Sequence, residues 1–182
     1  MLFDFSKVFD LLDHDILIKK LHKYNFSKDA LLWTISYLRN RSVCTNIKDE
    51  NSEFIETKYG VPQGSVLGPL LFTIYTYDLN NTLSQGTVFQ YADDTQILLA
   101  LNKEDAHNAE NIIAEAINIV QMWAKNNRLI LNTEKTQVLH LTKRAQMTEL
   151  TEAKNLGVIF DSKMNWQKYL QTVSKKVYKK NS

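Results

Sequence analysis

The spacing of hydrophobic and polar residues along the chain predicts five helices. The clearest runs from Ala106 to Trp123, where apolar side chains recur at intervals of three and four residues after a capping Asn102. The other helices are expected at residues 13–24 with Asp13 or Asp15 as the N-cap, at 27–38 with Ser27 as the N-cap, at 65–80, and from Trp166 onward.

Strand-like alternation of apolar and polar residues fills most of the segments between these helices. Residues 2–9 alternate in this way, and residues 87–101 form two short apolar runs that we expect to fold as a tight hairpin turning at Ala92 to Asp94. Because strands and helices alternate irregularly, the pattern favours an α+β fold over a doubly wound α/β sheet, with helices on one face of a mixed or antiparallel sheet. Further strands are expected in a hairpin at 41–60 that turns at 49–52, on either side of a turn at 128–142, and at 155–161.

Composition narrows the class of protein. The 182 residues are 44% hydrophobic, which is enough for the core of one compact or two-lobed domain. A net charge of +2 is too small to indicate a nucleic-acid partner by itself. The single cysteine, Cys44, excludes an intramolecular disulfide framework and a cysteine-rich zinc module, and it fits a reducing compartment. No apolar run reaches the roughly 18 residues of a membrane span, so we expect a soluble, intracellular protein.

Two adjacent aspartates, Asp93 and Asp94, interrupt an apolar stretch, and no Lys or Arg occurs between Lys58 and Lys103. Buried carboxylates are normally paired, protonated or bound to a metal, because an unpaired buried charge is costly. If the strand that carries Asp4 lies beside this hairpin, Asp4 and Asp93 meet at one edge of the sheet. Converging carboxylates suit Mg²⁺, and two such ions about 3.5 to 4 Å apart can promote in-line phosphoryl transfer. A large separation, or an aspartate locked to a lysine or arginine, would contradict this hypothesis.

Five segments of the sequence, in order, resemble the motifs of a reverse transcriptase of the jockey-like non-LTR (LINE-type) retrotransposons. They are "LFDFSKVFDLLDH", "GVPQGSVLGPLLF", "YADD", "LILNTEKTQVLHL" and "KNLGVIFDSKMNW". The resemblance implies the palm of a right-hand polymerase with part of the fingers. It makes residues 1–182 a partial reverse transcriptase domain, with a partial fingers hairpin at 41–60 and the start of the thumb at 163–182.

The resemblance also implies roles for single residues. Asp4 and Asp93 become ligands of two Mg²⁺ or Mn²⁺ ions, and Asp94 is either a third ligand or an acid that forms the turn. The resemblance makes Phe9 the gate against a 2′-hydroxyl, and the alternative is a core phenylalanine. It makes Pro62, Gln63 and Gly64 the loop that approaches nucleotide and template, and the alternative is a plain loop before a helix. Lys135 would protonate the leaving group or be a solvated lysine, and Gly157 would belong to the primer grip or be a turn glycine.

The implied activity is RNA-directed DNA synthesis on an RNA template from a DNA primer and deoxynucleoside triphosphates, with a nuclear place of action. The chain lacks the upstream fingers strands, the rest of the thumb and the endonuclease of complete enzymes, and Val8 replaces the alanine usual before the gate. One alternative is therefore a catalytically inactive remnant that at most binds nucleic acid. Another is an open reading frame whose product folds poorly.

Overall fold

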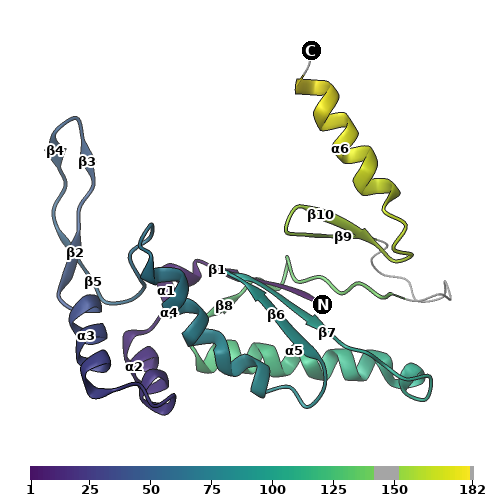
Figure 1. Ribbon diagram of the computed structural model, residues 1–182, viewed down its shortest axis with the longest axis horizontal. Helices are drawn as coiled ribbons and strands as arrows, with labels where there is room; N and C mark the ends of the chain where they lie inside the picture. The colour runs from purple at the N-terminus through teal and green to yellow at the C-terminus, as the bar shows by residue number, and fades with distance from the viewer. Residues whose placement is uncertain (142–151, 181–182) are drawn as a thin grey trace.

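A four-stranded antiparallel sheet with the strand order β6-β7-β1-β8 forms the centre of the computed structural model, which describes residues 1–141 and 152–180 (Figure 1). Alternate residues of β1 point to opposite faces, so Phe3 and Phe5 are buried while Leu2, Asp4 and Ser6 lie on the other face. The strands are β1 (Leu2–Ser6), β6 (Thr87–Tyr91), β7 (Asp94–Leu98) and β8 (Ile130–Leu131).

Two helices cover the buried face of this sheet, α4 (Leu67–Thr76) and α5 (Ala109–Asn126) (Figure 1). The ring of Phe5 meets that of Trp123 edge to face, with 6.1 Å between the ring centroids. Side chains from both helices form one apolar core with the strands. The opposite face, called the open face below, carries no helix of the described residues, but residues 153–164 line a hollow against part of it (Figure 1). The α+β class and the helices on one face are therefore confirmed.

A helical lobe and a long hairpin connect β1 to α4. The predicted caps are confirmed here, because Asp13 accepts a hydrogen bond from Ile16 N and Ser27 accepts one from Ala30 N. The hairpin turns at Lys48 and Asp49, which both have positive φ, slightly earlier than predicted. Its strands are β2 (Arg41–Val43), β3 (Asn46–Ile47), β4 (Glu50–Asn51) and β5 (Ile55–Thr57), and the helices are α1 (Val8–Leu11), α2 (His14–Lys23) and α3 (Lys28–Leu38).

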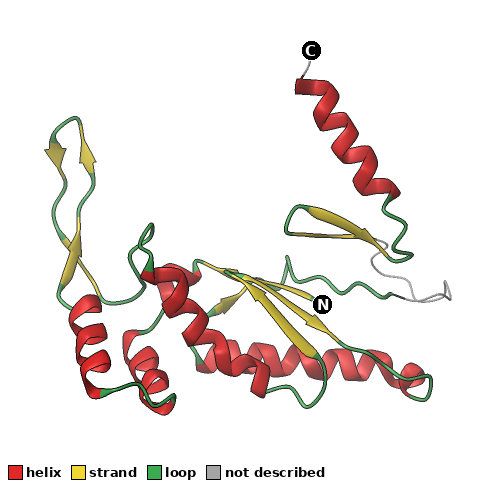
Figure 2. Ribbon diagram, in the orientation of Figure 1, coloured by secondary structure: helices red, strands yellow, loops and turns green. Residues whose placement is uncertain are grey.

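The C-terminal part is a second hairpin followed by a helix that extends away from the sheet (Figure 2). The predicted strand at 155–161 is β10 (Val158–Asp161), and it pairs with β9 (Glu152–Asn155), which the pattern did not predict. α6 (Gln167–Lys180) is the predicted terminal helix. Within the described residues, no helix is long and apolar enough to cross a membrane.

Several sequence predictions were wrong in detail. The strand expected at residues 2–9 ends at Ser6, because Val8 and Phe9 already belong to α1. Asn102 does not cap α5, which begins at Ala109 after the short 3₁₀ helix η2 (Asp105–Asn108). Residues 128–142 contain only the short strand β8, followed by a single bridge between Gln137 and Leu2, and residue 142 lies outside the described residues. The segment after β8 is fixed by its pairing with β1 rather than by its own periodicity.

A buried lysine ties the helical lobe to the helices beneath the sheet. Lys20 of α2 is only 7% exposed, and its Nζ donates to Oδ1 of Asp78 at 2.7 Å and to the carbonyl of Tyr75. The same Oδ1 accepts from Nε1 of Trp123 at 3.0 Å. Asp78 lies in the 3₁₀ helix η1 (Tyr77–Asn81), so one carboxylate joins three elements. Burial lowers the pKa of Lys20, while Asp78 opposes that shift.

We expect Asp78→Ala to lower the free energy of unfolding by about 3 kcal/mol, because it leaves the ammonium of Lys20 buried without its counter-ion. Urea unfolding followed by circular dichroism measures this. Asp15→Ala is the control, since its ion pair with Arg39 joins side chains that are 74% and 55% exposed and should contribute less than about 1 kcal/mol. Equal losses in the two variants would contradict the linking role of Asp78.

Candidate functional site

The strand register places Asp4 directly opposite Asp94. β1 pairs with β7 so that Leu2 faces Gln96, Phe3 faces Thr95 and Asp4 faces Asp94. Directly opposed residues of an antiparallel pair project from the same face, which here is the open face of the sheet. The expected meeting of β1 with the 87–101 hairpin is thus found, but the partner of Asp4 across the strands is Asp94 and not Asp93.

Asp93 occupies the tight turn beside this pair. Tyr91 pairs with Asp94 across the hairpin, so Ala92 and Asp93 form the turn, and Ala92 has a φ of 52°. Asp93 is exposed, whereas Asp94 is half-buried. Burial raises the pKa of the Asp94 carboxyl, and the negative charges of Asp93 and Asp4 raise it further. The three acids therefore influence one another, although the described residues contain no preformed group of three or more metal-ligating side chains.

Lys135 is the nearest cation to the acid pair. Its Nζ lies 3.5 Å from Oδ2 of Asp4, which is longer than a charge-assisted hydrogen bond, and its side chain is 67% exposed. The backbone around it is held to β1, because Asn132 N donates to the carbonyl of Asp4 and Gln137 exchanges two hydrogen bonds with Leu2. A solvated pair of this kind contributes little and leaves Asp4 open to other ligands. Asp4 therefore has an ion pair with Lys135, but this pair is long and solvated.

Phe9 and the 60–64 loop form a second group of predicted residues, held together by backbone contacts. Val61 N donates to the carbonyl of Phe9 at 2.7 Å, and the Phe9 ring packs against Phe72 with centroids 5.2 Å apart. Gly64 has a φ of 79°, a conformation that favours glycine. Val8, the residue that replaces the usual alanine, points into the core and is 2% exposed.

Comparison with known proteins identifies the family of this chain. The family profile "Reverse transcriptase (RNA-dependent DNA polymerase)" matches residues 1–160. The chain belongs to the reverse transcriptase family. It is 27% identical to the probable RNA-directed DNA polymerase from transposon BS of Drosophila melanogaster, over 97% of this chain and 21% of that protein. It is 25% identical to the RNA-directed DNA polymerase from mobile element jockey of the same organism, over 93% of this chain and 20% of that protein.

A solved structure agrees with the fold. The apo telomerase of Candida tropicalis, truncated from its C-terminal domain, superposes with a TM-score of 0.57 over 91% of this chain and 34% of that one, at 16% identity. At this identity the likeness concerns the fold alone. The chain spans about a fifth of the length of the curated relatives, so the resemblance to a non-LTR element's reverse transcriptase is confirmed for a part of such a protein.

A hollow of about 210 Å³ lies beside the acid pair of this reverse transcriptase chain. Asp4, Asp94 and Lys135 line it, together with residues that the sequence analysis missed. The Oε1 atom of Gln137 is buried there without a hydrogen-bond partner. No local signal marked Lys154 and Asn155, because β9 was not predicted. The missed lining residues are Gln96, Gln137, Lys154 and Asn155.

Gly157 lies in a turn and not within a strand, which corrects the expectation for the predicted primer-grip residue. Leu156 and Gly157 join β9 to β10, with φ values of 46° and 83°. Two successive positive φ values are typical of a two-residue hairpin turn. The turn is what brings Lys154 and Asn155 to the hollow beside the acids.

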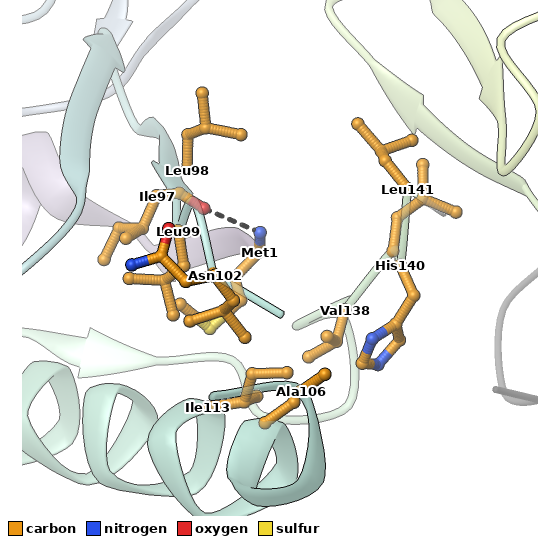
Figure 3. Close-up of a pocket in the computed structure, with 13 residues that line it drawn as sticks. Met1, Ile97, Leu98, Leu99, Asn102, Ala106, Ile113, Val138, His140 and Leu141 are labelled. Atoms are coloured by element: carbon orange, nitrogen blue, oxygen red, sulfur yellow. Dashed lines mark hydrogen bonds between the residues drawn. The ribbon is translucent and has the colours of Figure 1, made fainter. Parts of the chain in front are cut away.

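A larger hollow of about 260 Å³ lies at the far end of β7 (Figure 3). Mainly apolar side chains line it, including Leu99 and Ile113, and it contains none of the predicted site residues. The terminal amino group of Met1 donates to the carbonyl of Ile97 at its edge, at 2.8 Å, and burial lowers the pKa of that amino group. The acids, and not this apolar hollow, therefore mark the candidate site of this reverse transcriptase chain.

Without divalent ions, Asp94→Asn should raise the free energy of unfolding at neutral pH by up to about 1 kcal/mol, because it removes like charges directly opposed across two strands. The pKa of Asp94 is raised in the folded state, so between the ordinary pKa of an aspartate and the raised one the native chain keeps a proton that the unfolded chain has already lost. Stability should therefore fall as pH rises from the ordinary pKa of an aspartate through the raised one.

Urea unfolding of the wild type and Asp94→Asn at neutral and at acidic pH measures this difference. The gain should vanish at acidic pH, where both forms are neutral at this position. Asp15→Asn should show no comparable gain, because Asp15 pairs with Arg39. A destabilised Asp94→Asn at neutral pH would show that the acids do not repel one another.

Proposed function

We propose that this chain forms the catalytic core of an RNA-directed DNA polymerase, which joins deoxynucleotides to the 3′-hydroxyl of a primer by a two-metal mechanism. The observation that carries the proposal is the opposed pair Asp4 and Asp94, with Asp93 in the adjoining turn, on the open face of the sheet. No described helix covers this face, and the β9–β10 hairpin lies against part of it, so a nucleic-acid duplex would approach beside that hairpin. Curated relatives named as RNA-directed DNA polymerases support the same reading.

The donor atoms at this site fit a divalent ion. Carboxylate oxygens are ligands that Mg²⁺ and Mn²⁺ prefer, and Mg²⁺ usually keeps several waters and takes phosphate oxygens of the substrate. Burial, and then the negative charges of Asp93 and Asp4, raise the pKa of Asp94, and a bound cation would favour its ionised form. When bound, the ions would supply activation of the attacking hydroxyl and stabilisation of the leaving oxygen. Asp4, Asp93 and Asp94 would hold them.

The other predicted residues take roles around this centre. Phe9 would exclude a 2′-hydroxyl, Pro62 to Gly64 would approach the nucleotide and template, and Lys135 would donate a proton to the leaving pyrophosphate. The hairpin that turns at Gly157 would hold the primer end. The RNA template, the DNA primer and the nucleoside triphosphates would bind the open face, with 41–60 as the fingers hairpin and 163–182 as the start of the thumb. The place of action would be the nucleus.

A second candidate function is nucleic-acid binding without catalysis. One observation favours it: Lys135 and Lys154 line the same hollow as the acids and can contact phosphates. Such a remnant would bind RNA or DNA through lysines, with an affinity that falls steeply as salt concentration rises. It would incorporate no nucleotide.

Primer extension on an RNA template with a labelled DNA primer separates the two functions. The wild type should extend the primer only with Mg²⁺ or Mn²⁺, and Asp4→Asn and Asp93→Asn should each reduce incorporation by at least about 100-fold, because charge stabilisation by metal is worth several kcal/mol. Template affinity, measured by fluorescence anisotropy, should change little in either variant.

Asp15→Asn is the matched control and should extend the primer as the wild type does, since Asp15 lies in the helical lobe and pairs with Arg39. Salt-sensitive binding without incorporation at any metal concentration would establish the non-catalytic function instead. Full activity in Asp4→Asn would overturn the assignment of the acid pair.

A further inference from the structure

One side-chain contact of the 60–64 loop has no role in the reaction proposed above. Nε2 of Gln63 donates to Oδ1 of Asp10 at 2.7 Å, between residues 53 positions apart in the sequence. Gln63 belongs to the loop expected to approach the nucleotide, whereas Asp10 lies in α1 and is not among the predicted site residues. Both side chains are exposed, so core packing does not account for the contact.

The backbones that carry these two side chains are already joined. Gly60 N donates to the carbonyl of Leu12, and Nε2 of His14 donates to the carbonyl of Gly60, each at 2.7 Å. A Cβ atom on Gly60 would lie only 2.7 Å from the carbonyl oxygen of Phe9, so the loop passes α1 as closely as a glycine allows. The contact between Asp10 and Gln63 is therefore not needed to attach the loop. What it adds is the orientation of one amide group.

The chemistry of the partner decides that orientation. An ionised carboxylate only accepts hydrogen bonds, whereas an amide both donates and accepts. Facing Asp10, the Gln63 amide must present its NH₂ group, and its Oε1 must point elsewhere. A neutral asparagine at position 10 would allow either orientation, and an alanine would leave the amide free to rotate.

We propose that Asp10 is a positioning residue that holds the Gln63 amide with Oε1 presented to a hydrogen-bond donor of the incoming nucleotide. The proposal rests on the polymerase function proposed above and deepens it. Asp10 acts through Gln63 and need not touch the nucleotide. An amide held in one orientation before binding loses less entropy on binding than a freely rotating one, so Asp10 strengthens nucleotide binding by preorganisation.

The side-chain amide protons of Gln63 report the contact directly. In a ¹⁵N-labelled full chain, this signal is identified by its loss in Gln63→Glu. We expect Asp10→Ala to shift the signal and to speed its exchange with water, because the acceptor is gone. Asp15→Ala, which removes an exposed aspartate paired with Arg39, should leave the signal unchanged. An unchanged signal in Asp10→Ala would overturn the proposal.

Titration with a deoxynucleoside triphosphate and Mg²⁺, followed by the same signal or by equilibrium dialysis, tests the consequence. Asp10→Ala should bind the nucleotide about three- to tenfold more weakly, the range that corresponds to one net hydrogen bond. Gln63→Glu should also bind weakly, because two carboxylates then face each other. Combining it with Asp10→Asn should recover part of the affinity, because the new amide can donate to the glutamate.

A purely structural role for Asp10 would lower the stability of Asp10→Ala but would not produce this rescue of nucleotide affinity. Equal nucleotide affinity in the wild type and Asp10→Ala overturns the proposal. Absence of nucleotide binding by the folded wild type overturns it as well. Failure of the polymerase function gives a different result: the wild type binds nucleotide more tightly than Asp10→Ala yet extends no primer. That result leaves the positioning role of Asp10 established.

Discussion

The antiparallel pairing of β1 with β7 is the constraint on which the candidate site depends. A shift of this register by one residue would place Thr95 or Asp93 opposite Asp4, and it would turn the apolar residues of one strand toward water. Phe3, Phe5 and Ile97 prevent such a shift, because all three must stay in the core over α4 and α5. The same side chains that stabilise the sheet therefore determine which acids meet on its open face.

The acids on this face of the sheet are less closely paired than two acids elsewhere in the fold. Asp78 is paired with Lys20, and Asp13 is paired with Arg128 at 2.6 Å. Asp4, by contrast, has only a solvated lysine at 3.5 Å, and Asp94 faces two further acids. The fold pairs these two structural acids closely but gives Asp4 a solvated cation and Asp94 like charges, an arrangement that supports the function proposed above. This contrast is the physical argument for a cation-dependent site.

The 60–64 loop, which lies beside Phe9, is held against α1 by contacts between segments that are far apart in the sequence. Gly60 permits close backbone approach to α1, His14 donates to its carbonyl, and Asp10 orients Gln63. β1 leads directly from Asp4 to α1, so the acid pair and this loop are connected by a few residues of well-packed chain. One short segment of chain therefore links the acid pair to the 60–64 loop.

The sequence by itself determined the helices, the hairpin turning at Ala92 and Asp93, the α+β class and the family motifs, because periodicity, capping and turn chemistry act over a few residues. Only the tertiary structure decided that Asp94 opposes Asp4, that β9 carries Lys154 to the acids, and that Asp10 holds Gln63. Those contacts join residues far apart in the chain, and strand register and loop packing select them through the whole core. The local sequence pattern therefore does not predict which of these residues meet.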